Sequence, residues 1–221
     1  MKVVFTPVML AGALWLALGS GLAQNGFPTV VKWAEGAPNA TSDVKNDQKV
    51  EGLKTDDVHI WVSLSELKDT QYNRVWVKVS NNGKTPIDFN PLSAVLLKGD
   101  KAVKAEAPDK AAGSIQRYGE AKAQELSSAH CNNMIATQCQ PNNTQIQESK
   151  QVQSFTSQQS QWLRDNAVKE KTLAPGDDVE GFIAFKKDKK AADYTLHIPV
   201  GAQTFEFPLS AQNKAPSYDN N

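Results

Sequence analysis

The sequence predicts a mainly β protein, an immunoglobulin-like antiparallel β-sandwich of about seven strands with a helical insertion. Apolar residues occupy every second position in residues 58–64, 75–79 and 194–209, which is the pattern of strands that bury one face. Short segments rich in turn-forming residues separate these runs. Between residues 108 and 170 the composition shifts to Ala, Gln, Glu and Lys, which are good helix formers. We therefore expect a helical segment between two parts of one sandwich.

Residues 1–23 are predicted to be a secretory signal peptide. Lys2 supplies the positive start, residues 3–18 are largely apolar, and residues 21–23 offer the small side chains that a signal peptidase requires. An uncleaved membrane anchor is the alternative, although the apolar run is shorter than the roughly 20 residues that span a bilayer. We expect a secreted or periplasmic protein that has no membrane span once the signal is cleaved.

The two ends of the mature chain show little β pattern. Residues 24–56 form an N-terminal segment that we predict to be mostly loop, with residues 27–33 as a candidate edge strand. Residues 211–221 are polar and are predicted to be a disordered tail. The chain carries 24 basic and 24 acidic residues without a basic block in the sequence, so its electrostatics give no argument for nucleic acid or an anionic membrane as partner.

The first part of the sandwich is predicted to span residues 57–107, and its strongest feature is a hairpin with a turn at Lys68-Asp69. That turn predicts three apolar pairs on the inner face: Val58 with Val79, Ile60 with Val77, and Val62 with Val75. The same register places Trp61 opposite Trp76, and His59 opposite Lys78, on the outer face.

The second part of the sandwich is predicted to span residues 171–210. Its last two strands flank a two-residue turn at Gly201-Ala202. This short turn predicts the pairs Ile198 with Phe205, Leu196 with Phe207, and Tyr194 with Leu209. A slip of one residue would turn all six apolar side chains to solvent.

The insertion, residues 108–170, is predicted to contain helices at about residues 114–129 and 149–168. The second helix carries an apolar stripe made of Val152, Phe155, Gln159, Trp162 and Leu163. Cys131 and Cys139, the only cysteines, lie between the helices. In an oxidising compartment we expect them to form a disulfide, which would stabilise the fold by roughly 2.5 kcal/mol. The alternatives are a metal site or a nucleophile pair that uses the neighbouring His130.

Three segments carry a resemblance to a known group. They read V.V.VSNNGKTPIDFNP, LAPGDDVEGFIAF and YTLHIPVGAQTFEFPL. They resemble segments of uncharacterised exported bacterial proteins with an immunoglobulin-like β-sandwich. The layout is similar to secreted sandwich domains of unknown function that include a mycobacterial immunogenic exported protein. The resemblance covers the β portion alone, and it implies a fold without catalytic residues.

The outer face of the first hairpin offers a candidate binding surface: Trp61, Trp76, Arg74 and Lys78. One interpretation is that the helical insertion covers this face, so that the tryptophans pack against Phe155 and Trp162. The other is an aromatic platform for a sugar ring, a peptide or another protein.

No motif of a nucleophile–base pair, a metal cluster or a phosphate-binding loop is present in the sequence. Asp177, Asp178 and Glu180 could form a calcium site, but acidic residues are equally typical of a surface turn. We therefore predict no catalytic residue, no metal and no cofactor. The expected function is a non-enzymatic binding or structural module of the cell envelope, with an envelope protein or a glycan as partner. The alternative is a carbohydrate-active or other hydrolase whose carboxylates, for example Asp88 or Glu180, converge only in three dimensions.

Overall fold

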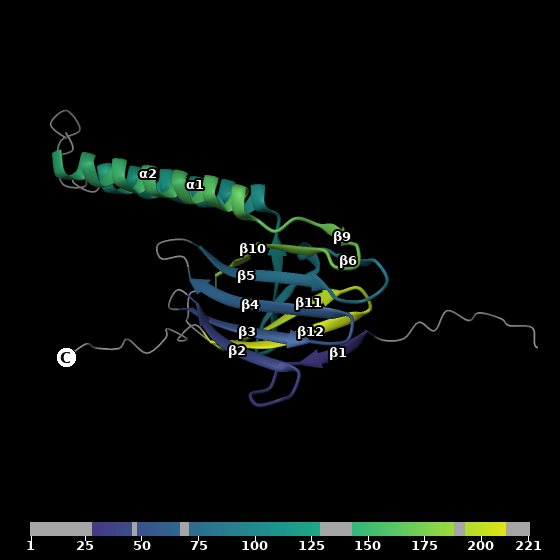
Figure 1. Cartoon of the computed structure of the whole chain (residues 1–221). Helices are drawn as coiled ribbons and strands as arrows, with labels where there is room; N and C mark the ends of the chain where they lie inside the picture. The colour runs from purple at the N-terminus through teal and green to yellow at the C-terminus, as the bar shows by residue number, and fades with distance from the viewer. Residues whose placement is uncertain (1–27, 46–47, 67–70, 129–142, 188–192, 211–221) are drawn as a thin grey trace, which may run out of the picture.

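The computed structural model describes residues 28–45, 48–66, 71–128, 143–187 and 193–210. This part of the chain is mainly β, with two long α-helices and one short 3₁₀ helix (Figure 1). The strands are β1 (Thr29–Lys32), β2 (Ala40–Lys45), β3 (Gln48–Lys54), β4 (Val58–Glu66), β5 (Tyr72–Asn81), β6 (Ile87–Phe89), β7 (Val95–Lys98), β8 (Lys101–Glu106), β9 (Lys171–Leu173), β10 (Asp178–Lys186), β11 (Asp193–Val200) and β12 (Gln203–Ser210). The helices are η1 (Pro91–Ser93), α1 (Pro108–Ser128) and α2 (Asn143–Asn166).

Ten of the strands form one curled sheet, in the order β1-β12-β11-β7-β8-β10-β5-β4-β3-β2, while β6 and β9 pair separately. The curl brings β11 and β12 behind β3 and β4 (Figure 1). Strand β8 joins the two layers, because it pairs with β7 on one side and with β10 on the other. The prediction of a simple seven-strand immunoglobulin-like sandwich is therefore wrong, although the mainly β class is confirmed.

The candidate edge strand at residues 27–33 overlaps β1, which lies at one edge of the sheet, but the rest of the N-terminal segment, predicted as loop, differs from the structure. Residues 24–56 contain the whole of β1, β2 and β3, and β1 pairs in parallel with β12. The β signal is weak here because β2 lies at the edge of the sheet and is largely exposed. A strand that buries neither face shows no alternation of apolar and polar residues.

The main core lies between the two layers. Both predicted hairpins contribute their apolar faces to it: Val58, Ile60, Val62, Val75, Val77 and Val79 on one side, and Tyr194, Leu196, Ile198, Phe205, Phe207 and Leu209 on the other. Each of these side chains is at most 4% exposed. The alternation in the sequence therefore identifies the residues that hold the fold together.

One of the two predicted strand registers is confirmed. In β11 and β12 the pairs are those expected from the turn at residues 201–202. In β4 and β5 the prediction is wrong by two residues, because Val62 lies opposite Val77 and Ile60 lies opposite Val79. A shift of two keeps every side chain on its predicted face. It changes the partners on the outer face.

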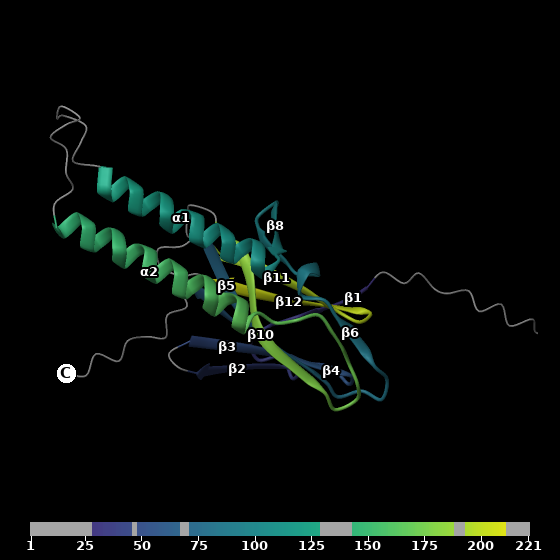
Figure 2. The same ribbon diagram turned by 90° about the horizontal axis from the view of Figure 1, so that it is seen from above.

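Helices α1 and α2 form an antiparallel hairpin that projects from the end of β10 (Figures 1 and 2). Their contact uses small and polar residues. The Oγ of Ser160 donates to the carbonyl of Ala112 at 2.9 Å, and Gly119 leaves room for the side chain of Thr156. Of the predicted apolar stripe, Leu163 is buried but Phe155 is 39% exposed. Within the described part of the chain, neither helix is long and apolar enough to cross a membrane.

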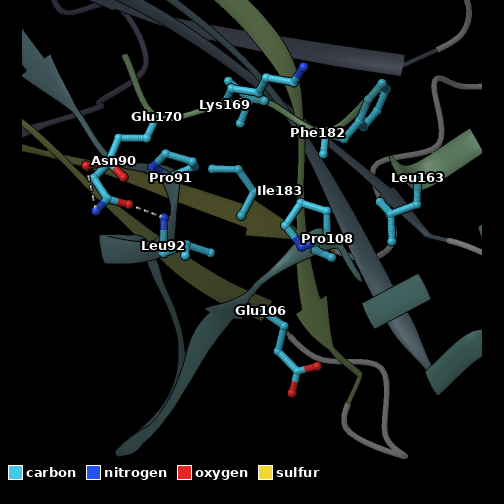
Figure 3. A pocket seen from close by; sticks show the side chains of 13 residues that line it. Asn90, Pro91, Leu92, Glu106, Pro108, Leu163, Lys169, Glu170, Phe182 and Ile183 are labelled. Carbon is cyan, nitrogen blue, oxygen red and sulfur yellow. Dashed lines mark hydrogen bonds between the residues drawn. The ribbon is translucent and has the colours of Figure 1, made fainter. Parts of the chain in front are cut away.

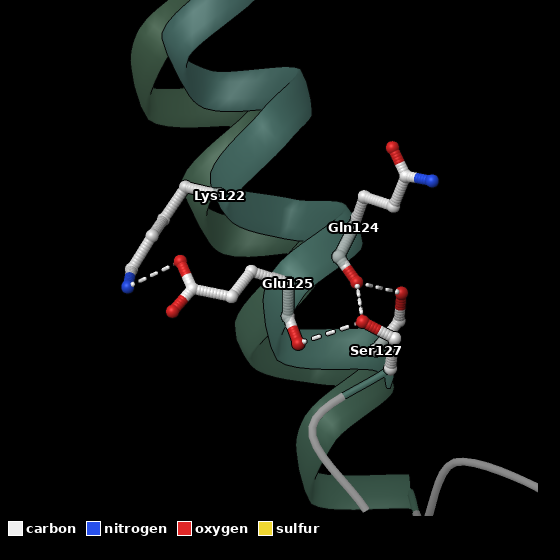
Figure 4. A network of polar contacts seen from close by, with 5 residues as sticks. Lys122, Gln124, Glu125 and Ser127 are labelled. Carbon is white, nitrogen blue, oxygen red and sulfur yellow. Dashed lines mark hydrogen bonds and ion pairs between the residues drawn. The ribbon is translucent and has the colours of Figure 1, made fainter. Parts of the chain in front are cut away.

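The far end of α1 is polar (Figure 4). Lys122 pairs with Glu125 at 2.9 Å. The hydroxyls of Ser127 and Ser128 donate to the carbonyl of Gln124 at 2.9 and 2.8 Å. The last four carbonyls of a helix have no partner within the helix. The carbonyl of Glu125 is the first of these, and it accepts from the Ser128 hydroxyl at 3.2 Å, which stabilises a helix end that lies away from the sandwich.

The helical hairpin is anchored to the sheet at Gly181 of β10. Just after α2, the backbone N–H of Val168 donates to the carbonyl of Phe182 at 3.1 Å, and Ala167 forms a parallel bridge with Phe182. Gly181 has φ of +155°, and a Cβ there would lie 2.6 Å from the backbone nitrogen of Val168. The absence of a side chain at residue 181 is therefore what lets the two segments come together.

Candidate binding face

The outer face of the β4-β5-β10 part of the sheet carries a row of rings. His59 and Trp61 come from β4, Trp76 from β5 and Phe182 from β10, and Trp162 of α2 lies at the end of the row. We call these five side chains the aromatic band. The four strand residues share the outer face because each occupies a position between two inward-facing residues of its strand, and Trp162 reaches this face from α2. All five are partly exposed.

The strand registers set the spacing of the band. Phe182 is the direct partner of Trp76 across β10 and β5. Trp61 lies opposite Lys78, and Trp76 lies opposite Ser63, so the two tryptophans are diagonal neighbours and not the direct pair expected from the sequence. Diagonal neighbours on one face of a sheet are about 7–8 Å apart. At this spacing large aromatic side chains are within reach of one another.

Trp61 is held by its neighbours on β3 and β4. The ring centroids of His59 and Trp61 are 3.5 Å apart, with 31° between the ring planes. The Cδ1 and Nε1 atoms of Trp61 lie over Gly52, where a Cβ would come within 3.0 Å and 3.2 Å of them. Burial lowers the pKa of His59, and the positive charge of Lys54 lowers it further. His59 is therefore a neutral ring support for Trp61 at neutral pH.

Arg74 lies beneath the end of α2 and does not flank an open platform. Its guanidinium carbon is 4.3 Å from the ring centroid of Trp162 and 5.6 Å from that of Phe182. Burial lowers the pKa of Arg74 to about 10, so the side chain remains a cation at neutral pH. A cation against aromatic rings contributes about 0.5–2 kcal/mol, which supports the joint between helix and sheet.

Lys78 forms the polar border of the band. Its Nζ is 2.7 Å from a carboxylate oxygen of Asp178 and 3.8 Å from one of Glu180. The hydrogen bond to Asp178 is the main cause that raises the pKa of Lys78, and the same bond lowers the pKa of Asp178. Asp177 instead pairs with Lys171 at 3.3 Å. The carboxylates of this turn are thus engaged by lysines, as in the surface-turn interpretation.

The helical insertion covers one end of the band. Trp162 packs edge-on against Phe182, with ring centroids 4.6 Å apart, and both helices contact β10. Phe155, which was expected to pack on the tryptophans, is among the exposed large apolar residues. Trp61 and Trp76 therefore retain partly exposed rings beyond the helix.

A small apolar pocket lies at the root of α2, beside η1 and β10 (Figure 3). Leu163, Phe182 and Ile183 contribute to its lining, and Asn90 and Glu170 lie at its edge, 3.4 Å apart. Its volume is about 190 Å³, whereas pockets for drug-sized ligands measure about 300–1,000 Å³. Because its volume is below this range, we interpret the pocket as a packing gap where α2 meets the sheet and not as a ligand site.

Several predicted site residues take no part in a common site. Cys131, Cys139 and His130 lie outside the described residues. Among the described residues, no group of three or more His, Cys, Asp or Glu side chains could hold a metal ion. The two carboxylates named for a hydrolase lie on separate sheets: Asp88 on β6, where it accepts from Thr172 at 2.6 Å, and Glu180 on β10.

Three members of the band, His59, Phe182 and Trp162, were not predicted as site residues. The sequence indicates a strand at Phe182 and an apolar helix stripe at Trp162, but neither pattern says which neighbour the side chain meets. The pairing of β5 with β10 joins residues about a hundred positions apart. The alternation placed Trp61 and Trp76 on the outer face, but nothing in the sequence showed that Phe182 continues the row.

Comparisons with known proteins add little to this geometry. No protein-family model matches the chain, and no curated protein matches it. Two similar solved structures both come from Bacillus subtilis. The first, the candidate lipoprotein YcdA, is 12% identical over 72% of this chain, with a TM-score of 0.38, and the chain spans 38% of its length. The second, the YjhA protein, is 11% identical over 76% of this chain and 78% of its own, with a TM-score of 0.32.

These structural likenesses are to bacterial proteins, and their low TM-scores carry no argument about fold or function. The immunoglobulin-like family suggested by the sequence is not confirmed by them. The functional argument therefore depends on the residues of this chain alone.

Glu51 lies beside Gly52 but on the opposite face of β3, where it is 2% exposed. One carboxylate oxygen is 2.7 Å from Nζ of Lys49, and the other has no hydrogen-bond partner among the described residues. Burial raises the pKa of Glu51, although the hydrogen bond from Lys49 partly opposes this. Ionised Glu51 is therefore a source of instability at neutral pH.

Replacing Glu51 by glutamine should change how stability depends on pH. The folded wild type takes up a proton at a higher pH than the unfolded chain, so Glu51 contributes more stability as the pH falls through its raised pKa. The stability of Glu51→Gln relative to wild type should therefore be highest at pH 7 and decline toward pH 4. Melting temperatures at several pH values would show this. The exposed Glu148→Gln is the control, and an equal trend in both variants would contradict the assignment.

Proposed function

We propose that this chain is a non-enzymatic binding module of the cell envelope, and that its aromatic band binds a neutral glycan. The observation that carries the proposal is that Trp61 and Trp76 are diagonal neighbours on the outer face of β4 and β5 and that both are partly exposed. Rigid aromatic side chains provide a large contact area at low cost in conformational entropy. Exposed apolar patches of this kind typically mark binding sites.

The polar border of the band favours a sugar over a purely apolar partner. A sugar ring presents C–H groups on its faces and hydroxyls around its rim. Indole faces match the former, while Lys78, Asp178 and Glu180 offer donors and acceptors for the latter. Lys78 and Asp178 form a close ion pair without net charge, which suits a neutral ligand. The predicted export would bring the protein to a compartment where glycans are abundant.

Replacing both Trp61 and Trp76 by alanine should weaken glycan binding by at least about tenfold, because buried aromatic contacts dominate binding energy. We would titrate the full chain with chitotetraose, cellotetraose and maltotetraose, and follow tryptophan fluorescence and heat of binding. Wild type should bind at least one of them. The melting temperature of the double variant should change by a few degrees at most, because both rings lie on the outer face.

Phe155→Ala is the matched control, since it removes an exposed aromatic ring from the helical hairpin. It should bind the same sugar as wild type does. If no probe binds wild type, while the double variant loses much of its thermal stability, the tryptophans serve packing and the proposal is wrong.

A further inference from the structure

One carboxylate at the edge of the aromatic band lacks a close partner. Glu180 lies on β10 directly opposite Lys78 of β5, and its side chain is 61% exposed. The Nζ of Lys78 is 2.7 Å from Asp178 but 3.8 Å from Glu180, and among the described residues no shorter ion pair involves Glu180. Because N–H···O hydrogen bonds are about 2.7–3.2 Å long, the oxygens of Glu180 stay available to accept from a ligand.

The strand registers place this carboxylate beside the two indoles. Lys78 is the direct cross-strand partner of Trp61 on one side and of Glu180 on the other. Trp76 lies two residues before Lys78 on β5, so it is a diagonal neighbour of Glu180 on the same face. Long side chains reach across such a diagonal, which is about 7–8 Å. A sugar ring stacked on Trp76 would therefore bring its rim groups close to Glu180 and Lys78.

The gap between Lys78 and Glu180 matches a hydroxyl group. A lysine ammonium donates hydrogen bonds and a carboxylate accepts them, whereas a hydroxyl does both. A sugar hydroxyl can therefore accept from Lys78 and donate to Glu180 at the same time. Hydrogen bonds of about 2.9 Å from the N–H and about 2.7 Å from the O–H can span the 3.8 Å between the two charged groups. Bonds of this kind, with a charged partner, are stronger than those between neutral groups.

We propose that Glu180 selects unsubstituted, hydroxyl-rich sugars, such as the hexose units of a glucan, over N-acetylated and acidic sugars. This inference rests on the proposed glycan function and names the class of glycan. Free hydroxyls supply the donors that a carboxylate requires. An acetamido group brings a carbonyl oxygen that can only accept, and Lys78, the donor that it could use, is already held by Asp178. A uronic acid would place a further negative charge beside Glu180, which is unfavourable.

The test compares the full wild-type chain with Glu180→Gln by titration calorimetry. Cellotetraose and maltotetraose are the unsubstituted probes, and chitotetraose is the acetylated probe. Wild type should bind at least one unsubstituted probe about tenfold or more tightly than chitotetraose, because hydrogen bonds to charged groups are among the stronger ones. Glutamine has a similar size but no charge, and it adds N–H donors, so Glu180→Gln should narrow this preference by at least about fivefold. Glu180 is exposed, so the fold should persist, as circular dichroism would show.

Asp177→Asn is the matched control, because it removes one negative charge from the turn before β10, where Asp177 pairs with Lys171 at 3.3 Å. It should keep the wild-type preference. Equal narrowing in both variants would overturn the inference, since total charge would then explain the preference. An unchanged preference in Glu180→Gln, or tighter binding of chitotetraose by wild type, would also overturn it and leave the glycan proposal intact. If wild type binds none of the three sugars, the glycan proposal itself fails.

Discussion

Replacing Gly181 by alanine should lower the free energy of unfolding by about 3 kcal/mol, which corresponds to a fall in melting temperature of about 6–12 °C for a chain of this size. Two effects add. A side chain at φ of +155° is strained, and such strain costs about 1–3 kcal/mol. The new Cβ would also lie 2.6 Å from the nitrogen of Val168 and 2.8 Å from the carbonyl oxygen of Asn166. Both are backbone atoms that cannot rotate away.

The damage should be concentrated at the joint between α2 and β10. Moving the backbone at Val168 would lengthen its hydrogen bond to Phe182. The contact of Trp162 with Phe182 should loosen with it. Calorimetry would measure the stability, and hydrogen exchange would show whether residues 166–183 lose protection first.

Gly113→Ala is the matched control for this substitution. Gly113 lies inside α1, and a Cβ there would meet just one atom, Nη1 of Arg117, at 3.6 Å. Alanine is favoured over glycine in a helix interior by about 1 kcal/mol, so this variant should be slightly more stable than wild type. A Gly181→Ala protein with wild-type stability would show that the joint adapts without cost.

The contrast between the two hairpins shows what the sequence could and could not predict. In β11 and β12, the turn at Gly201-Ala202 is so short that one register satisfies it. In β4 and β5 the alternation alone is compatible with registers two residues apart, because each keeps the same side chains inside. The residues on the inner faces were therefore predictable in both hairpins, while the cross-strand neighbours of Trp61 on the outer face were not.

Non-local contacts account for the rest of what was missed. The bridging role of β8 depends on two pairings. The pairing with β7 is local, through the two-residue turn at Gly99-Asp100, whereas the pairing with β10 joins residues about eighty positions apart and leaves no local trace in residues 101–106. The β10 end of the aromatic band arises in the same way, from the pairing of β5 with β10. In the helical segment, by contrast, the signal is local composition, and α1 and α2 overlap the predicted helices.

Replacing Asn81 by alanine should lower the free energy of unfolding by about 3 kcal/mol, through hydrogen bonds and not through lost apolar packing. The side chain is fully buried. Its Nδ2 donates to the carbonyls of Thr85 and Leu173 at 2.8 and 2.9 Å, and its Oδ1 accepts from the N–H of Gly83 at 2.9 Å. Removing the amide leaves three backbone groups without that partner, and an unmade bond costs about 1–3 kcal/mol for a buried group.

Asn81→Asp separates hydrogen bonding from volume, because it keeps the shape and the acceptor while it replaces the donor. At pH 7 a carboxylate would face two carbonyl oxygens, so this variant should be at least as unstable as Asn81→Ala. Its stability should recover in part as the pH falls, since a protonated carboxyl can donate one bond. Chemical unfolding at pH 7 and pH 4 would measure both effects. Wild-type stability of Asn81→Asp at pH 7 would contradict the argument, because the donor would then be dispensable where β5, β9 and the turn between β5 and β6 meet.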